Sequence, residues 1–371
     1  MMWLTWRQHR AQILVTAGFL ALLGVLLLGS AVEASRYVAE HAAPGCPGPA
    51  VACGELAVAL GQRYDAVYSV FGWMPLVLPA LIGAFWGAPL LGREYERGTH
   101  RLAWTQSVPV WRWLAVKLSV LGGAVVAGGL LLSLMVGLWR PVFRAGVDSS
   151  FGNIGVFNMV GVAPAAWWLY ALALGTVAGT LFRRTLPAMA LVVAGVAVTM
   201  FTLFQLSDHY AEPARVELSG TVLPDDPDPR LVSAAWVEPS GREVADPAGS
   251  GCPRRVDVGP SNRNAEAWQA CLFGKGYKYA VYYHPPSRFW RFQWTDAGIL
   301  TLASVAFGGV AVRRTLRRPA DGARSVSGAR GDGKNRSMTV SQVAGGIGIR
   351  VSGAGPFPAG DDTWSLPFSP P

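Results

Sequence analysis

Residues 92–117 read GREYERGTHRLAWTQSVPVWRWLAVK, and the interpretation of the whole chain starts from this stretch. It combines both charge signs, a glycine, a proline and several aromatic side chains. Uncharged apolar runs flank it at 67–91 and 118–138. At a rise of about 1.5 Å per residue, each run is long enough to cross a hydrocarbon core about 30 Å thick. The stretch is therefore predicted to connect two membrane spans.

The composition of this connector predicts a helix break followed by a short second helix. Gly98 tolerates the left-handed conformation that closes a helix, so it ends the extension of the second span. Thr99 caps the new helix, and Pro109 stops it. Glu94 and Glu96 are expected on neighbouring faces of the extension. They are available to the basic groups of a partner or, in the alternative interpretation, are solvated charges that flank the membrane.

The same stretch resembles the connector between the second and third spans in permease subunits of ABC transporters of the ABC-2 type. That connector typically reads Arg-Glu-x-Glu-x-Gly-Thr, followed by a leucine, a proline-containing turn with an arginine, and a lysine. The matching residues here are Arg93, Glu94, Glu96, Gly98, Thr99, Leu102, Pro109, Arg112 and Lys117. The motif similarity is confined to this stretch, while the order of elements is similar over residues 1–318.

The resemblance implies that the connector carries a short helix that docks into a groove on a separate cytoplasmic ATPase. It also implies that the permease forms a homodimer or pairs with a second permease, and works by alternating access. ATP and Mg²⁺ are then expected on the partner subunit, with no cofactor on this chain. The candidate ATPase-coupling residues are Arg93, Glu94, Glu96, Gly98, Thr99, Arg101 and Pro109.

Six apolar runs predict an all-α membrane protein with six transmembrane helices. The predicted spans are 11–31, 67–91, 118–138, 160–182, 186–206 and 297–312. The first run also resembles a signal peptide, but it exceeds the usual length of about 7–15 apolar residues and further spans follow. The last run is short, so it crosses only if Trp294 and Asp296 lie in one interface and arginines 313–314 snorkel to the other.

The segments outside the spans complete the predicted organisation. Residues 1–10 form an interfacial N-terminal segment or a simple basic flank of the first span. Residues 207–293 form a large extracellular insertion between helices 5 and 6, in which the alternation over 277–283 indicates a strand. Residues 319–371 lack apolar periodicity and are predicted to be a disordered cytoplasmic tail.

Two prolines within the second predicted span are candidate kinks. Pro75 and Pro79 lack the backbone donor, so the helix bends unless neighbours satisfy the carbonyl groups that lose their partners. Gly83 and Gly87 form a small-xxx-small pair, which favours close helix packing. Such a helix suits a moving pathway lining, and tight packing alone is the alternative.

Charge and cysteine placement predict the orientation. Arginine and lysine concentrate in the flanks and loops that become cytoplasmic when the N-terminus lies inside. The protein is thus expected in the cell membrane, with both termini cytoplasmic. The cysteines all lie in segments that this orientation places outside, where disulfides persist. They are Cys46, Cys53, Cys252 and Cys271. Pairing within each loop is the simplest of three connectivities, and a metal site is the less favoured alternative.

Several function classes are excluded by what the sequence lacks. The net charge of +9 could suggest nucleic acid, but the basic residues partition by loop and form no single stripe. The first five predicted spans contain no Asp, Glu, Lys, Arg or His, which argues against an ion-coupled transporter or proton pump. A motif at 328–334 resembles a phosphate-binding loop, but Asn335 stands where Ser or Thr would hold Mg²⁺. The chain is therefore not predicted to be an enzyme or to bind a metal.

The leading hypothesis is the membrane-spanning permease subunit of an ATP-binding-cassette transporter, exporting a hydrophobic or amphipathic substrate. Its expected partners are a cytoplasmic ATPase, a second permease and membrane lipid, and not nucleic acid. The alternative is a membrane-anchored sensor or assembly protein with an extracellular ligand-binding loop domain. A lipid-modifying enzyme comes third. Apolar spans describe lipid, drug and peptide export equally, so the substrate stays open.

Overall fold

The computed structural model describes residues 2–42, 51–96, 109–140, 151–219, 229–252 and 263–329. The chain divides into two compact units, residues 1–321 and residues 322–371. The helices and strands below belong to the first unit, except for the last turns of the final helix.

Six helices in the described part are long and apolar enough to cross a membrane. They are His9–His41, Asp65–Glu96, Trp111–Trp139, Ala163–Phe182, Thr185–Ser207 and Pro286–Leu316. The predicted number and order of spans are confirmed. Helices are expected here because, in lipid, backbone polar groups must be satisfied within the segment.

The first span belongs to a single helix, α1, which runs from Met2 to His41. Its 40 residues correspond to about 60 Å, well beyond the hydrocarbon core. Residues 1–10 are therefore not a separate element, because no glycine or proline interrupts the chain before Gly18. Helix α2, Val51–Arg63, follows, and an ion pair of 2.7 Å between Arg63 and Glu33 joins it to α1.

The second span is built from three helical pieces. These are α3 (Asp65–Ile82), the π-helical turn η1 (Gly83–Gly87) and α4 (Ala88–Glu96). Pro75 and Pro79 lie inside α3. In η1 the Ala88 N–H donates to the Gly83 carbonyl, five residues back, so the helix is widened one turn after Pro79.

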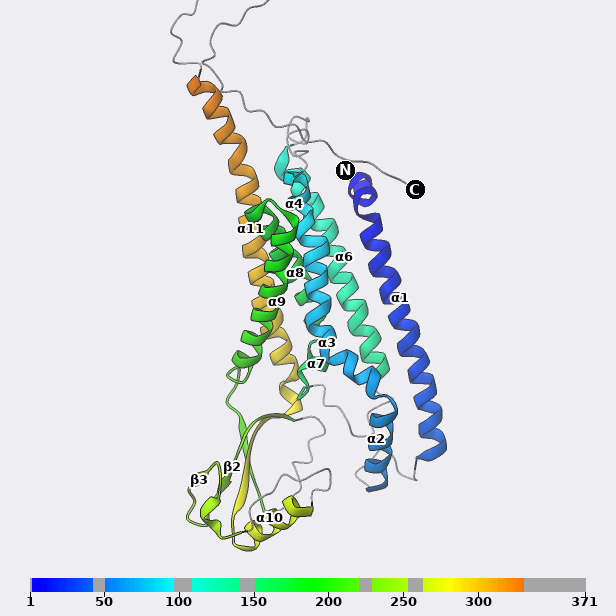
Figure 1. The fold of residues 1–371 in the computed structure, drawn as a ribbon, viewed down its shortest axis with the longest axis vertical. Helices are drawn as coiled ribbons and strands as arrows, with labels where there is room; N and C mark the ends of the chain where they lie inside the picture. The colour runs from blue at the N-terminus through cyan, green and yellow to red at the C-terminus, as the bar shows by residue number, and fades with distance from the viewer. Residues whose placement is uncertain are drawn as a thin grey trace, which may run out of the picture. The chain divides into compact units, whose positions relative to one another are not determined.

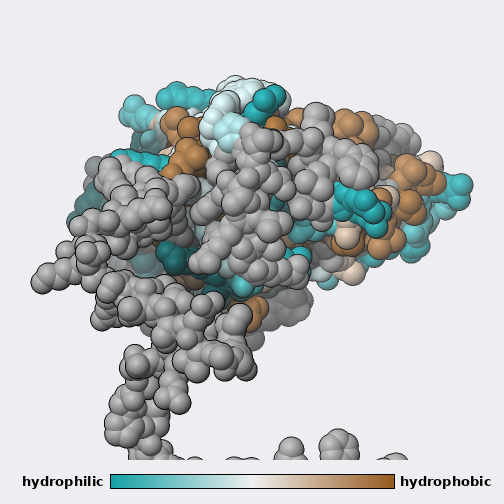
Figure 2. Space-filling model, turned by 90° about the horizontal axis from the view of Figure 1, so that it is seen from above, coloured by the Kyte–Doolittle hydropathy of each residue, from teal (hydrophilic) through white to brown (hydrophobic). Residues whose placement is uncertain are grey.

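Helix α8 lies at the centre of the spans and packs against the second, third and fifth of them (Figure 1). The remaining helices are α6 (Val110–Trp139), α7 (Ile154–Phe157), α8 (Ala163–Phe182), α9 (Thr185–Ser207) and α11 (Phe289–Ala329). α8 is buried from Ala163 to Thr180 apart from Leu169. By contrast, Leu14, Val25 and Leu302 on outer helices are each more than 60% exposed. Figure 2 shows such hydrophobic residues, in brown, on the outside of the molecule. This is the distribution expected where lipid covers the surface.

The last span is longer than the predicted 297–312. α11 begins at Phe289, so residues 289–296, which include Trp294 and Asp296, belong to the helix. Asp296 is buried there and accepts a hydrogen bond from the Tyr210 hydroxyl at 2.5 Å. The helix continues to Ala329, so the predicted disordered tail begins in helix, while residues 330–371 lie outside the described part.

The expectation of an all-α chain is wrong between spans 5 and 6, where a four-stranded antiparallel sheet forms. Its strands are β1 (Ala214–Leu218), β2 (Arg230–Val237), β3 (Glu243–Val244) and β4 (Lys278–His284), in the order β1-β4-β2-β3. β4 confirms the strand indicated over 277–283. The short helical turns η3 (Ala248–Ser250) and η4 (Pro286–Arg288) and helix α10 (Arg263–Gly274) accompany the sheet.

The sheet has a small aromatic core of its own. Trp236 of β2 contacts the rings of Trp268, Phe273 and Tyr279 at centroid distances of 4.9–5.5 Å. A disulfide joins Cys252 to Cys271 of α10. These contacts bury aromatic residues against α10, which hydropathy averaged over a polar segment does not reveal.

Candidate functional site at the N-terminal end of the spans

A buried ion pair links the end of α4 to α6. Lys117 Nζ lies 2.5 Å from Glu94 Oε1, and only 4% of the lysine side chain is exposed. The same ammonium group lies 4.1 Å from the centre of the Trp113 ring, one turn earlier on α6. A buried ammonium is costly unless it is paired, so the carboxylate and the ring together compensate its desolvation. The predicted coupling residue Glu94 thus holds the second span against the third.

Glu96 connects the same end of α4 to α9. Its Oε1 accepts a hydrogen bond of 2.7 Å from the Thr185 backbone N–H, and its Oε2 accepts one of 2.8 Å from the Thr185 hydroxyl. Thr185 is the first residue of α9, so its N–H has no partner within that helix. A carboxylate at this position also interacts favourably with the helix dipole. Arg183, in the left-handed conformation with φ 54°, makes the tight turn from α8.

The other predicted coupling residues are only partly described. Arg93 is exposed and makes no ion pair within the described ranges. Pro109 is extended, with ψ 136°, and begins α6. Gly98, Thr99 and Arg101, with the predicted short helix, lie outside the described residues. The structure therefore brings the two ends of the connector together. Glu94, at the end of α4, pairs with Lys117 of α6, where the connector ends. Glu96 joins the same end of α4 to α9.

Glycines allow the second and fourth spans to approach closely. A Cβ on Gly87 would lie 2.6 Å from the Leu172 carbonyl oxygen, and one on Gly175 would lie 2.3 Å from the Gly83 carbonyl oxygen. Gly179 faces the Ala88 carbonyl oxygen at 2.6 Å in the same way. The predicted small-residue pair on the second span thus meets a second such pair on α8.

A contact that sequence reasoning missed joins α1 to the widened turn. Gln12 Nε2 donates to the Phe85 carbonyl at 2.7 Å. In a regular helix this carbonyl would accept from residue 89, but Pro89 has no N–H. Gln12 therefore supplies the missing donor from another span. Two signals were present: a polar amide in the apolar run 11–31, and a third proline in the run 67–91.

A pocket of about 490 Å³ lies beside this contact, between α1 and the second span. Its lining residues are Ala11, Gln12, Val15, Thr16, Phe19, Leu78, Leu81, Ile82, Phe85, Trp86 and Trp168. Nine of these eleven side chains are apolar. Gln12 Oε1 lies 2.6 Å from His9 Nδ1, and Gln12 Nε2 donates to the Phe85 carbonyl, so both polar atoms of the side chain have partners.

At the opposite end of the spans, buried polar residues tie the sheet to α9 and α11. Arg230, at the start of β2, is buried and donates to Ser207 Oγ at 2.5 Å and Asp208 Oδ1 at 3.2 Å. Burial, followed by the hydrogen bond to Asp296, raises the pKa of Tyr210. Burial also lowers the pKa of His284, whose Nε2 has no hydrogen-bond partner in the described part.

Gln293 of α11 makes a second cross-span connection near this end. Its Oε1 accepts from the backbone N–H groups of Val162 and Ala163 at 3.2 and 3.1 Å, and its Nε2 donates to the Phe157 carbonyl at 2.8 Å. The side chain is fully buried. Gln293 thus caps the N-terminus of α8 from a helix that lies 130 residues later in the chain.

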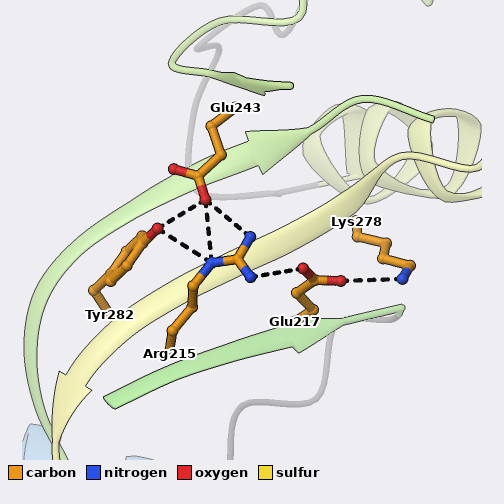
Figure 3. Close-up of polar contacts among 5 residues, drawn as sticks. All are labelled: Arg215, Glu217, Glu243, Lys278 and Tyr282. Atoms are coloured by element: carbon orange, nitrogen blue, oxygen red, sulfur yellow. Dashed lines mark hydrogen bonds and ion pairs between the residues drawn. The ribbon is translucent and has the colours of Figure 1, made fainter. Parts of the chain in front are cut away.

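The exposed side of the sheet carries a charged network, drawn in Figure 3. Arg215 of β1 contacts Glu243 at 2.9 Å and Glu217 at 2.8 Å, and Lys278 contacts Glu217 at 3.0 Å. The Tyr282 hydroxyl donates to Glu243 at 2.7 Å. This bond, followed by that from Arg215, lowers the pKa of Glu243. The bond from Lys278 chiefly lowers the pKa of Glu217.

The described residues contain no cluster of three or more His, Cys, Asp or Glu side chains that could hold a metal ion. Cys53 is disulfide-bonded, and Cys46 lies outside the described residues. The buried Lys117, Arg230 and Gln293 instead hold helices and strands together.

Six apolar membrane-length helices, with α8 packed against the second, third and fifth spans, define a multi-pass membrane protein. The chain belongs to the ABC-2 membrane transporter related family, whose model matches residues 17–206. The match runs from within the first span to the end of the fifth and includes the connector, and it makes the chain a membrane permease of the ABC-2 type. No curated protein and no solved structure matches the chain.

Proposed function

We propose that this permease is driven by a separate cytoplasmic ATPase and exports a hydrophobic or amphipathic substrate. The observation that carries the proposal is the anchoring of the connector's ends. Glu94 fixes the last turn of α4 to α6, and Glu96 fixes it to α9. A force applied to residues 97–108 would therefore reach three spans at once.

The proposed roles of the motif residues differ from one another. Glu94 and Glu96 are positioning residues, because their carboxylates already have partners within the chain. Arg93 is exposed on the same turn, so it is the charge at the end of α4 that is proposed to contact a partner. Gly98, Thr99 and Arg101 are proposed to form the docking helix itself. The orientation with both termini in the cytoplasm, and pairing with a second permease, belong to the same proposal.

The test is co-purification of the chain with a candidate ATPase subunit that is co-expressed with it. Arg93→Glu is expected to lower ATPase recovery at least fivefold while the amount of chain in the membrane stays unchanged. Arg314→Glu, which reverses an exposed charge on α11, is the matched control and should leave recovery at the wild-type level. Equal recovery with both variants would remove the docking assignment. Full export in cells that lack every candidate ATPase would remove the proposed function.

The ordered sheet favours one alternative, a sensor or assembly protein whose insertion binds a ligand outside the membrane. In the described part, however, the charged groups of the sheet mainly contact one another, and Arg230 ties the sheet to the spans. A neighbouring gene for an ATPase favours transport, whereas a neighbouring kinase or regulator without an ATPase favours the sensor.

A further inference from the structure

We propose that the pocket between α1 and the second span binds one acyl chain of a membrane phospholipid. The proposal concerns lipid binding alone and does not depend on the ATPase. The pocket lies among residues of the predicted apolar runs 11–31 and 67–91, and Trp168 of the run 160–182 completes its lining. Its occupant would come from the surrounding bilayer.

The lining selects hydrocarbon. Because the amide of Gln12 already contacts Phe85 and the His9 ring, Thr16 supplies the one remaining polar side chain among the lining residues. A sugar, peptide or nucleotide placed here would lose its hydrogen bonds to water without replacement. In a bilayer, the apolar groups present at high concentration around the pocket are phospholipid acyl chains.

The size and the neighbouring charge fit the same occupant. A volume of about 490 Å³ lies within the range of about 300–1,000 Å³ that is usual for small-molecule sites. Arg10 is exposed one residue before the first lining residue, Ala11. An arginine at this depth can hold the phosphate of the headgroup while the chain extends into the pocket.

The pocket also adjoins the widened turn of the second span. Phe85 and Trp86 of η1 line it, and the Gln12–Phe85 bond joins its two sides. Helical π-turns occur frequently at functional sites. Trp86 and Trp168 are 5% and 2% exposed and line the pocket, so they form its inner wall and leave only a small part of each ring accessible to a lipid chain.

The first test measures phospholipid retained by the full chain after extraction in mild detergent, by native mass spectrometry. Val15→Trp fills the pocket from α1. Leu14→Trp, at a neighbouring exposed position that is not part of the lining, is the control. Val15→Trp is expected to retain at least fivefold less phospholipid than the control. Equal retention, or a bound mass that corresponds to free fatty acid alone, would overturn the proposal.

A second test leaves the pocket unfilled. In nanodiscs that contain phospholipid brominated along its acyl chains, bromine quenches tryptophan fluorescence on contact. The double variant Trp86→Phe/Trp168→Phe should show a smaller quenched component than wild type, and Arg10→Gln should raise the concentration of anionic brominated lipid needed for half-quenching at least threefold. An unchanged quenched component in the double variant would show that lipid does not enter.

Discussion

Removing one member of the Glu94–Lys117 pair leaves the other charge where little water reaches it. Both residues belong to the connector motif, yet they lie 23 positions apart in the chain and on different spans. The lysine is the more deeply buried partner. The carboxylate of Glu94 therefore compensates the desolvation cost of the buried ammonium group.

Glu94→Ala is therefore expected to destabilise the protein by about 3 kcal/mol, the lower end for a broken buried pair. Thermal unfolding of the purified chain in detergent measures the change. In the double variant Glu94→Ala/Lys117→Met no charge is left unpaired, and most of the loss should be recovered. Additive losses from the two substitutions would mean that the residues do not act as a pair.

The Gln12–Phe85 contact gives a second test at the scale of single residues. Gln12→Leu leaves the Phe85 carbonyl without its donor, at an expected cost of about 1–3 kcal/mol. Pro89→Ala restores a backbone N–H at the position that would normally bond to this carbonyl. The double variant should thus unfold at a higher temperature than Gln12→Leu alone. If Pro89→Ala brings no recovery, the absent proline donor is not why Gln12 is needed.

Among the elements, the contact between the second span and α8 depends on backbone meeting backbone. Gly83, Gly87 and Gly175 leave no room for a methyl group, whereas nothing lies within 4 Å of a Cβ on Gly123 of α6. Whether a glycine is needed for helix packing therefore depends on how close the neighbouring helix lies, and not on its presence in a span.

Gly175→Ala is expected to separate the two helices and to cost about 1–3 kcal/mol, as overpacking usually does. Gly123→Ala is the matched control. It should be neutral or slightly stabilising, because alanine favours helix more than glycine does. Melting temperatures measured in the same detergent provide the comparison. Equal melting temperatures for the two variants would contradict the close approach of the helices.

In the whole molecule, the sheet and the spans respond to different conditions. The sheet carries exposed ion pairs on its surface, and a buried arginine joins it to α9. The spans have apolar outer surfaces, and their stabilising polar contacts are mostly buried. Acid should therefore affect the sheet before it affects the helices.

The pKa values of Glu217 and Glu243 are lower in the folded protein than their ordinary value of 4.5. Their contribution to stability is therefore complete above pH 4.5 and is lost as the pH falls through the lowered folded values. Hydrogen exchange of β1 and β4, corrected for intrinsic rates, should rise in that window. Glu243→Gln should weaken this pH dependence, and an unchanged profile would argue against the network.

The sequence alone was sufficient to establish the membrane class, the six spans and their order, because long apolar runs must form helices in lipid. It also located the connector motif, whose residues resemble those of the ABC-2 family. It could not show the partners of Glu94 and Glu96, since those partners lie on α6 and α9 and no local pattern predicts such pairing. Nor could it show that Gln12 replaces the donor missing at Pro89.

The sheet and the length of the last helix were decided by tertiary contacts. Short strands with mixed polarity give a weak periodic signal, and the aromatic core around Trp236 forms only when β2, β4 and α10 meet. Likewise, the polar residues Asp296 and Gln293 give no signal of a continuing helix in the sequence. In the structure, Tyr210 bonds to Asp296 and the first residues of α8 bond to Gln293. Hydropathy describes the preference of a single residue for water or for an apolar environment. The residues named here are stabilised by groups that are distant in the chain, so hydropathy does not predict their burial.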